Sequence, residues 1–136
     1  MTKKLKFTIL FSVCVFAYSQ DKPNPNFTGG EVKTIKENSD GKSAHFYFSP
    51  GSRTKWHSHG GGQIILVEDG VGLYQEKGGP VVELRANETH YCPPGVIHWH
   101  GAAAKEGGTQ FNVSRGDITW LAEVTDAEYN VKPVHK

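Results

Sequence analysis

Residues 54–67 read TKWHSHGGGQIILV, two runs of β-forming residues separated by three consecutive glycines. In the first run His57 and His59 flank Ser58, so both imidazoles leave the same face of a predicted strand, about 7 Å apart. The glycines allow the chain to fold back, which brings the amide oxygen of Gln63 toward the same point. This segment therefore predicts that metal-ligating side chains converge on a β scaffold.

A second pair of alternating histidines, His98 and His100, follows the rigid corner at residues 93–95, Pro-Pro-Gly. One such pair is more often structural than metal-binding. Two pairs about 40 residues apart, each beside a glycine-containing corner, predict a metal site. The remaining histidines lack such a partner and are not assigned to the site: His45, His90 and His135.

The composition is typical of one domain built from short strands. A length of 136 residues allows one domain of ordinary size. A net charge of +1 with 21% charged residues excludes a polybasic nucleic-acid surface and a chain kept disordered by excess charge. Sixteen glycines and seven prolines favour many tight turns. The composition therefore favours an all-β fold.

Beyond Ser43, short runs of β-forming residues are divided by turn residues every eight to ten positions, which predicts a sandwich or barrel made of hairpins. A capping box at residues 125–128 predicts one short helical turn. Cys92 is interpreted as a small buried strand residue. The predicted strands are 31–35, 44–48, 54–59, 63–67, 72–76, 81–84, 89–92, 96–100, 109–114 and 117–124.

The N-terminus predicts export. Three lysines precede an apolar run at residues 7–17, the layout of a signal peptide at residues 1–19 that is cleaved before Gln20. The run is too short for a permanent membrane span, so we expect a periplasmic or secreted protein with no membrane contact in its mature form. Residues 20–42 are expected to form a loose N-terminal arm, and residues 43–136 the barrel with a short C-terminal tail.

These residues resemble the cupins. The first cupin motif is similar to the spacing of Gly51, His57, His59, Gln63 and Gly70, with glutamine in place of the usual glutamate. The second motif is matched at Pro93, Gly95 and His98, whereas Asn87 stands in place of its first glycine and Ala102 in place of its final asparagine. Asparagine tolerates positive φ better than other non-glycine residues, so Asn87 is a mild departure.

A narrower likeness is to small single-domain cupins related to the carboxymuconolactone decarboxylase-associated group, which include manganese-dependent bacterial hydroxynitrile lyases. It spans about residues 44–129 and is strongest at 56–59, 62–67, 74–76 and 93–102. The resemblance implies a double-stranded β-helix, a jelly-roll-like barrel. It also implies a homodimer or higher homo-oligomer, because an incompletely closed barrel leaves edge strands that need covering.

The resemblance further implies one divalent transition metal per chain, manganese first, with iron, nickel, cobalt and zinc also compatible. Its ligands would be His57, His59, Gln63 and His98. Because a neutral amide replaces a carboxylate, the site would keep the full +2 charge of the ion. His100 shares a face with His98 and is expected to act as a general base near neutral pH. The alternative is that His100 orients a metal ligand through a hydrogen bond.

The most direct functional expectation is an exported metal-dependent lyase that acts on a small molecule, resembling the hydroxynitrile lyases. Two alternatives remain: a quercetinase-like metal-dependent dioxygenase and a non-catalytic barrel that binds a metal or small ligand. Gln110 and Asn112 lie on one late strand, and a polar contact to ligand is expected from this pair. Arg53 and Arg115 could hold a carboxylate, but they lie near turns, where arginines are usually solvated, and we expect them to be solvated. The aromatic residues expected to divide between barrel lining and outer packing are Phe46, Phe48, Trp56, Trp99 and Phe111.

Overall fold

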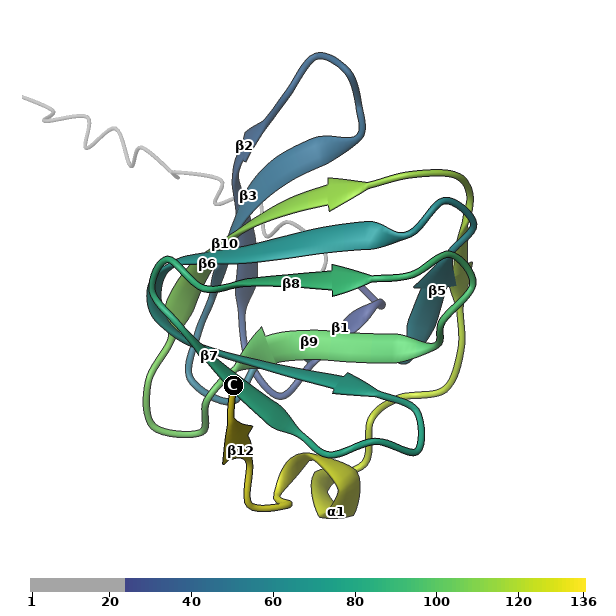
Figure 1. The fold of residues 1–136 in the computed structure, drawn as a ribbon. Coiled ribbons are helices and arrows are strands. Elements are labelled where there is room, and N and C mark those ends of the chain that lie inside the picture. The colour runs from purple at the N-terminus through teal and green to yellow at the C-terminus, as the bar shows by residue number, and fades with distance from the viewer. Residues whose placement is uncertain (1–23) are drawn as a thin grey trace, which may run out of the picture.

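One 14-residue strand, β6 (Gln63–Glu76), joins the two sheets of the barrel in this computed structural model, which describes residues 24–136 (Figure 1). Its first half pairs with β8 and β10, and its second half pairs with β7 and β9. Except for the short parallel pair of β7 with β12, all ladders between described strands are antiparallel. The all-β prediction is therefore confirmed. The other strands are β1 (Phe27–Thr28), β2 (Val32–Glu37), β3 (Ser43–Phe48), β4 (Arg53–Thr54), β5 (His57–His59), β7 (Val82–Arg85), β8 (Thr89–Cys92), β9 (His98–Ala102), β10 (Gly108–Ser114), β11 (Ile118–Trp120) and β12 (Val134–His135).

The predicted strands 63–67 and 72–76 form one continuous strand, because the residues between them, which have the composition of a turn, form a bulge instead. The register of β6 against β10 shifts between Thr109 and Gln110, which leaves one extra residue on β6. Gly70 adopts a φ of 72°, and a Cβ at this position would collide with the carbonyl oxygen of Gly107. The bulge changes which side chains face inward, so that Val67 before it and Tyr74 after it belong to the same core.

Two separate cores stabilise the barrel. Residues Ile65, Val67, Tyr74, Leu84 and Cys92 form a cluster that includes the inward side chains of β6. The second cluster lies on the opposite face of β9 and β6, where the C-terminal segment covers it; its residues are Trp56, Leu73, Val81, Trp99, Val124 and Tyr129. Every residue of β9 is consequently buried, with its histidines on one face and Trp99 on the other.

The segment expected to be a loose arm contributes two strands. Strand β2 pairs along β3, and β1 pairs with β4. The predicted signal peptide at residues 1–19 lies outside the described residues. Within residues 24–136, no helix has the length and apolarity needed to cross a bilayer.

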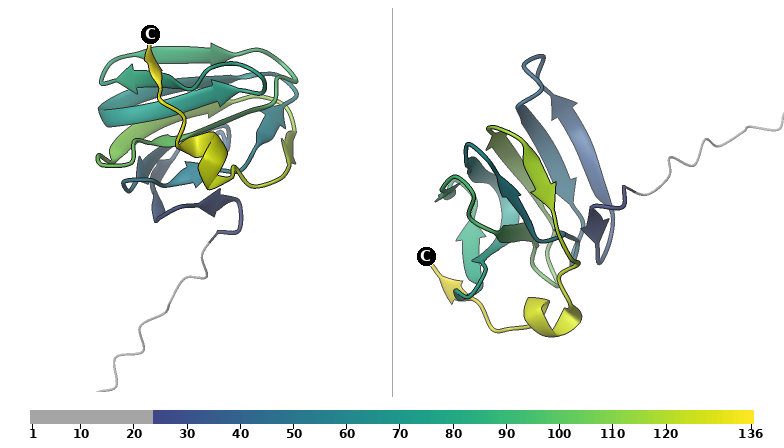
Figure 2. Two further views of the ribbon diagram at one scale, coloured as in Figure 1. Left: turned by 90° about the horizontal axis from the view of Figure 1, so that it is seen from below. Right: turned by 90° about the vertical axis from the view of Figure 1, so that its right-hand side faces the viewer.

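The C-terminal segment begins with a short helix, α1 (Asp126–Tyr129), which lies against the outside of the barrel (Figure 2). The predicted capping box is confirmed, because the Thr125 side chain accepts from the amide of Glu128 and the Glu128 carboxylate accepts from the amide of Thr125. The Tyr129 hydroxyl donates to the carbonyl oxygen of Ala102 at 2.7 Å. These contacts hold the segment over the second core.

Arg53 of β4 ties this segment to the barrel. Its Nη2 donates to the carbonyl of Val124 at 3.0 Å and to the carboxylate of Asp126 at 2.7 Å, and its guanidinium lies 4.5 Å from the ring centroid of Tyr129. The expectation that Arg53 is solvated is therefore wrong, because partners 71 and 73 residues later in the chain bury it. Arg115 is exposed, as expected.

Replacing Arg53 with alanine is expected to lower the free energy of unfolding by about 3 kcal/mol, because the carbonyl of Val124 would lose its donor inside the protein. Chemical denaturation of the purified variant measures this change. The matched control is Arg115→Ala, whose exposed side chain should leave stability within about 0.5 kcal/mol of wild type. Equal stability of the two variants would show that the contacts of Arg53 contribute nothing.

Candidate metal centre

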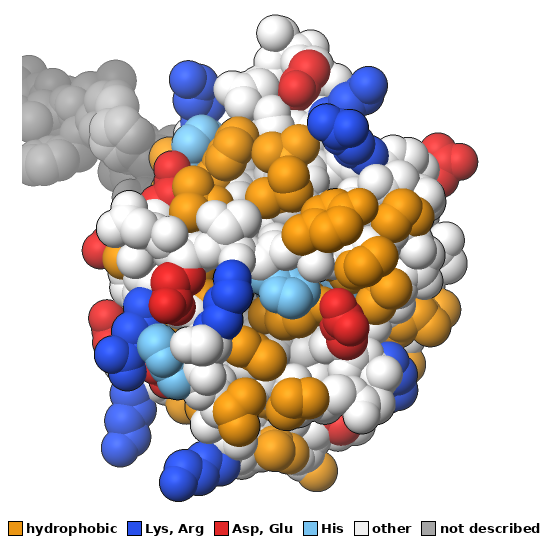
Figure 3. Space-filling view, viewed as in Figure 1, with side chains coloured by type: hydrophobic (Ala, Val, Ile, Leu, Met, Phe, Trp, Pro, Cys, Tyr) orange, Lys and Arg blue, Asp and Glu red, His pale blue; other side chains and the backbone are white. Residues whose placement is uncertain are grey.

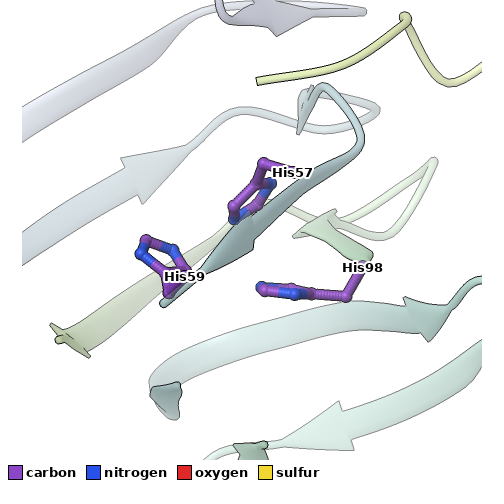
Figure 4. Close-up of side chains that lie close together, drawn as sticks. All are labelled: His57, His59 and His98. Atoms are coloured by element: carbon purple, nitrogen blue, oxygen red, sulfur yellow. The ribbon is translucent and has the colours of Figure 1, made fainter. Parts of the chain in front are cut away.

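Three histidines from two neighbouring strands converge inside the barrel (Figure 4). His57 and His59 leave the same face of β5, as the alternation in sequence predicts. His98 of β9 is the ladder partner of His57, so register alone brings the second strand's histidine to the pair. The ligand nitrogens of the three rings lie within 4.8 Å of one another, and all three side chains are buried. This group could hold a metal ion.

Backbone carbonyls orient two of these rings. His57 Nδ1 lies 2.9 Å from the carbonyl oxygen of Lys55, and His98 Nδ1 lies 3.0 Å from that of Val96. A carbonyl only accepts, so each Nδ1 carries the proton and each Nε2 keeps a free lone pair. Burial lowers the pKa of His57 to about 3 and that of His98 to about 4, so both rings are neutral at physiological pH. Neutral imidazoles are the form that binds a metal.

His59 is buried without any polar partner. Neither Nδ1 nor Nε2 of this ring has a hydrogen-bond partner among the described residues. Burial also lowers its pKa, so the ring is neutral. An unpaired buried nitrogen is unfavourable by about 1–3 kcal/mol, whereas coordination of a cation would satisfy it.

Gln63 faces the same point from the first position of β6. Its Nε2 donates to the Ser114 hydroxyl at 3.1 Å, which fixes Oε1 2.7 Å from Nε2 of His98. Two acceptor atoms at this separation repel unless a proton or a cation lies between them. The preceding Gly62 has a φ of 83°, and a Cβ there would lie 2.8 Å from the carbonyl oxygen of Cys92. Only glycine therefore allows the turn that delivers Gln63.

The donor set fits a divalent metal ion. Metal–nitrogen bonds of about 2.1 Å place neighbouring ligand atoms about 3 Å apart, which is close to the observed approach of Gln63 and His98. The three imidazoles and one amide are all neutral donors. A bound cation would therefore keep its full charge and attract anionic or hydroxyl groups strongly.

His100 lies next to this group but is held by a different partner. Its Nδ1 donates to Oε1 of Gln110 at 2.9 Å, and Nε2 of Gln110 donates to the carbonyl oxygen of Gly101 at 2.8 Å. Gln110 is thereby fixed as the acceptor, so Nε2 of His100 carries the free lone pair. Burial holds the pKa of His100 well below its usual value, so the ring is neutral but less basic than the sequence predicted.

A cavity of about 570 Å³ opens onto His57, His59, Gln63 and His100. Phe46 and Phe48 line it, and they are two of the aromatic residues expected to divide between barrel lining and outer packing. Phe27 and Trp120, which the sequence did not single out, close its wall, with Phe27 6.5 Å from Trp120 between ring centroids. The cavity therefore joins a polar end to an aromatic end.

The other histidines lie away from this cavity. His45 is on the outer face of the sheet, where it contacts Glu68 at 2.9 Å and the Phe111 ring at 4.6 Å between centroids. The ring of His90 lies against that of Tyr74, with 3.7 Å between the ring centroids.

The face formed by β3, β10, β6 and β8 is largely hydrophobic (Figure 3). Trp56 and Trp99 belong to the second core, so the expected division of aromatic residues is confirmed.

Cys92 is a buried strand residue, as predicted, but it also touches the site. Its Sγ lies 3.0 Å from Nδ1 of His98. Burial raises the pKa of the thiol to about 11, so Cys92 is a neutral neighbour of the ring.

Strand β10 supplies roles that sequence reasoning missed. Gln110, Asn112 and Ser114 alternate along its inward face, and the first and third of them hold His100 and Gln63. The polar-aromatic-polar order around Phe111 signals alternation but not which face is inward. The structure places Gln110 and Asn112 inside and Phe111 outside.

The sequence of this chain is similar to a known protein family and to a characterised enzyme. The profile of the Cupin domain matches residues 44–114, more than half of the chain. The (R)-mandelonitrile lyase of Granulicella tundricola is 40% identical over 86 residues, which cover 60% of this chain and 66% of that enzyme. The matched region thus spans slightly less than two thirds of that relative.

Solved structures agree on the fold. A cupin-like protein from Thermotoga maritima is 41% identical with a TM-score of 0.66, over 76% of this chain and 84% of that chain. A Klebsiella pneumoniae protein with a double-stranded β-helix domain is 22% identical with a TM-score of 0.54, over 72% of this chain and 89% of that chain. The second likeness supports the fold alone.

Proposed function

This chain belongs to the cupin family, and from that premise we propose that it is a metal-dependent lyase that cleaves an aryl α-hydroxynitrile into an aldehyde and hydrogen cyanide. The observation that carries the proposal is the position of His100. Its Nδ1 is fixed by Gln110, and its free Nε2 belongs to a residue that lines the same cavity as His57, His59 and Gln63. A base and a cluster of metal-ligating groups thus border one space.

The metal would be held by His57, His59, His98 and Gln63. When bound, it would supply a Lewis acid that stabilises negative charge on the hydroxyl oxygen of the substrate. Manganese is the ion we propose first, since neutral nitrogen and oxygen donors are compatible with it, as they are with iron, cobalt, nickel and zinc.

In the proposed reaction His100 transfers one proton from the substrate hydroxyl to the leaving cyanide. Its Nε2 accepts the proton of the substrate hydroxyl, the oxygen electron pair forms the carbonyl bond, and the carbon–carbon bonding pair leaves with cyanide. Cyanide then takes up the proton from His100, which restores the neutral ring. Gln110 supports both steps, because its Oε1 accepts from Nδ1 throughout and fixes which nitrogen faces the substrate.

The aromatic end of the cavity supports an aryl substrate. Phe27, Phe46 and Trp120 line it, and aromatic rings pack favourably against such walls. The relative from Granulicella tundricola is named a mandelonitrile lyase, and mandelonitrile carries an aryl group, a hydroxyl group and a nitrile on one carbon. We therefore propose mandelonitrile or a close analogue as the first substrate to test.

The test is cyanide and benzaldehyde release from mandelonitrile by the full chain, stripped with a chelator and then reloaded with Mn, Fe or Zn. We expect release with the reloaded protein and none above background with the stripped protein. Oxygen uptake with flavonols in place of cyanide release would support the dioxygenase. Inactivity in both assays, with thermal stabilisation by aryl alcohols, would support a ligand-binding barrel.

A further inference from the structure

Three polar side chains of β10 face inward, and Asn112 is the one among them for which no hydrogen bond to a residue of the site has been described. Gln110 on one side of it holds His100, and Ser114 on the other side holds Gln63. Residues two positions apart on a strand are separated by about 7 Å, so Asn112 stands between the proposed base and the metal-ligating amide. It also lines the cavity itself.

Asn112 is a buried polar residue whose side-chain oxygen is unpaired among the described residues. The side chain is 4% exposed, and its Oδ1 has no hydrogen-bond partner among the described residues. Its ladder neighbours on either side are Ile65 of β6 and Ala44 of β3, which are both apolar. Buried polar groups without partners are rare in native proteins and ask for an explanation, of which an absent ligand is one.

We propose that the carboxamide of Asn112 binds a second polar group of the substrate, one that lies next to the hydroxyl-bearing carbon. Resting on the proposed function, that group is the nitrile, whose nitrogen accepts a hydrogen bond from the Asn112 amide. The nitrile nitrogen needs a donor, and rotation of the carboxamide by 180° places Nδ2 where the unpartnered Oδ1 lies. The side chain can therefore present its donor to the cavity.

This contact makes the site a three-point receptor. The hydroxyl group would lie between His100 and the metal-ligating residues, the aryl ring beside Phe46 and Trp120, and the nitrile at Asn112. Three different groups on one carbon, each fixed at its own position, admit only one hand of the molecule. Asn112 is thus the residue that determines enantioselectivity.

The test compares Asn112→Leu, which has a similar volume and no polar atoms, with wild type and with Val113→Thr, an outward position on the same strand. We expect Asn112→Leu to lower the preference for one mandelonitrile enantiomer by about 10-fold and to raise KM, with metal content unchanged. The melting temperature should not fall, because Oδ1 has no partner to lose. Val113→Thr should match wild type in all four measurements.

A binding measurement separates this inference from the proposed reaction. Phenylacetonitrile carries the aryl ring and the nitrile, and benzyl alcohol carries the ring and the hydroxyl. In the metal-loaded protein, Asn112→Leu should weaken phenylacetonitrile about 10-fold and leave benzyl alcohol unchanged. If this result is obtained and mandelonitrile is not cleaved, the nitrile contact of Asn112 is supported and the proposed lyase activity is overturned. Unchanged affinity for phenylacetonitrile, or a fall in melting temperature without a change in ligand preference, would overturn the role of Asn112.

Discussion

Replacing His59 with leucine is expected to abolish metal binding while the metal-free protein becomes no less stable than wild type. His59 has no hydrogen bond to lose, since neither ring nitrogen has a partner among the described residues. Leucine removes two buried unpaired nitrogens at little change in volume, so the free energy of unfolding of the metal-free protein should rise by about 1 kcal/mol. A purely structural histidine would give the opposite sign.

The same variant should lose most of its activity. We expect metal content to fall from near one ion per chain to background, and kcat/KM to fall by about 10³-fold or more, equivalent to about 4 kcal/mol. Elemental analysis of the purified protein measures the metal content. Calorimetry of the stripped protein measures the stability of the metal-free form. Added Mn should raise the melting temperature of wild type and not of the variant.

The control for this prediction is the same substitution at a histidine outside the cavity. His45→Leu removes a ring that pairs with Glu68 on the outer face of the sheet, so metal content should stay at the wild-type level. If His59→Leu retained a full complement of metal, the three-histidine group would not be where the ion binds.

Replacing His100 with alanine is expected to lower kcat by about 10²–10⁴-fold, the usual range for loss of a general base, with metal content unchanged. The ring is buried, and its Nε2 carries the lone pair that would accept the substrate proton. The cavity left by the substitution should admit free imidazole. Added imidazole should therefore restore part of the activity.

Two outcomes would contradict this assignment. Metal loss from His100→Ala would place His100 among the ligands, and an unchanged kcat would remove it from the chemistry. His90→Ala is the control, because His90 stacks on Tyr74 and does not line the cavity.

The part of the site that depends on local sequence was predictable. The two His-X-His pairs and the glycine turn before Gln63 place five side chains by alternation and by one positive φ. Asn87, which replaces a motif glycine, does adopt a φ of 70°. Each of these features is decided by a few consecutive residues, so spacing alone carries the information.

The features that depend on distant pairing were not predictable. The hydrogen bond from His100 to Gln110 depends on the registers in which β9 and β10 each pair with β6, which no local pattern encodes. Residues 68–70 have turn composition, yet pairing with β10 holds them in a bulged strand. Arg53 is buried only because Val124 and Asp126 return to it. In each case a tertiary partner overrides the local signal.

The carbonyl groups of Lys55 and Val96, which fix the orientation of two histidine rings, belong to the main chain. Every amino acid supplies the same oxygen, so the identity of the side chains at these two positions is irrelevant to this task. Evolution can therefore vary residues 55 and 96 to suit solubility or packing without retuning the imidazoles. The orientation of these two rings depends on the backbone fold and not on the side chains at positions 55 and 96. These positions therefore tolerate substitution, which they would not if a carboxylate side chain oriented the rings.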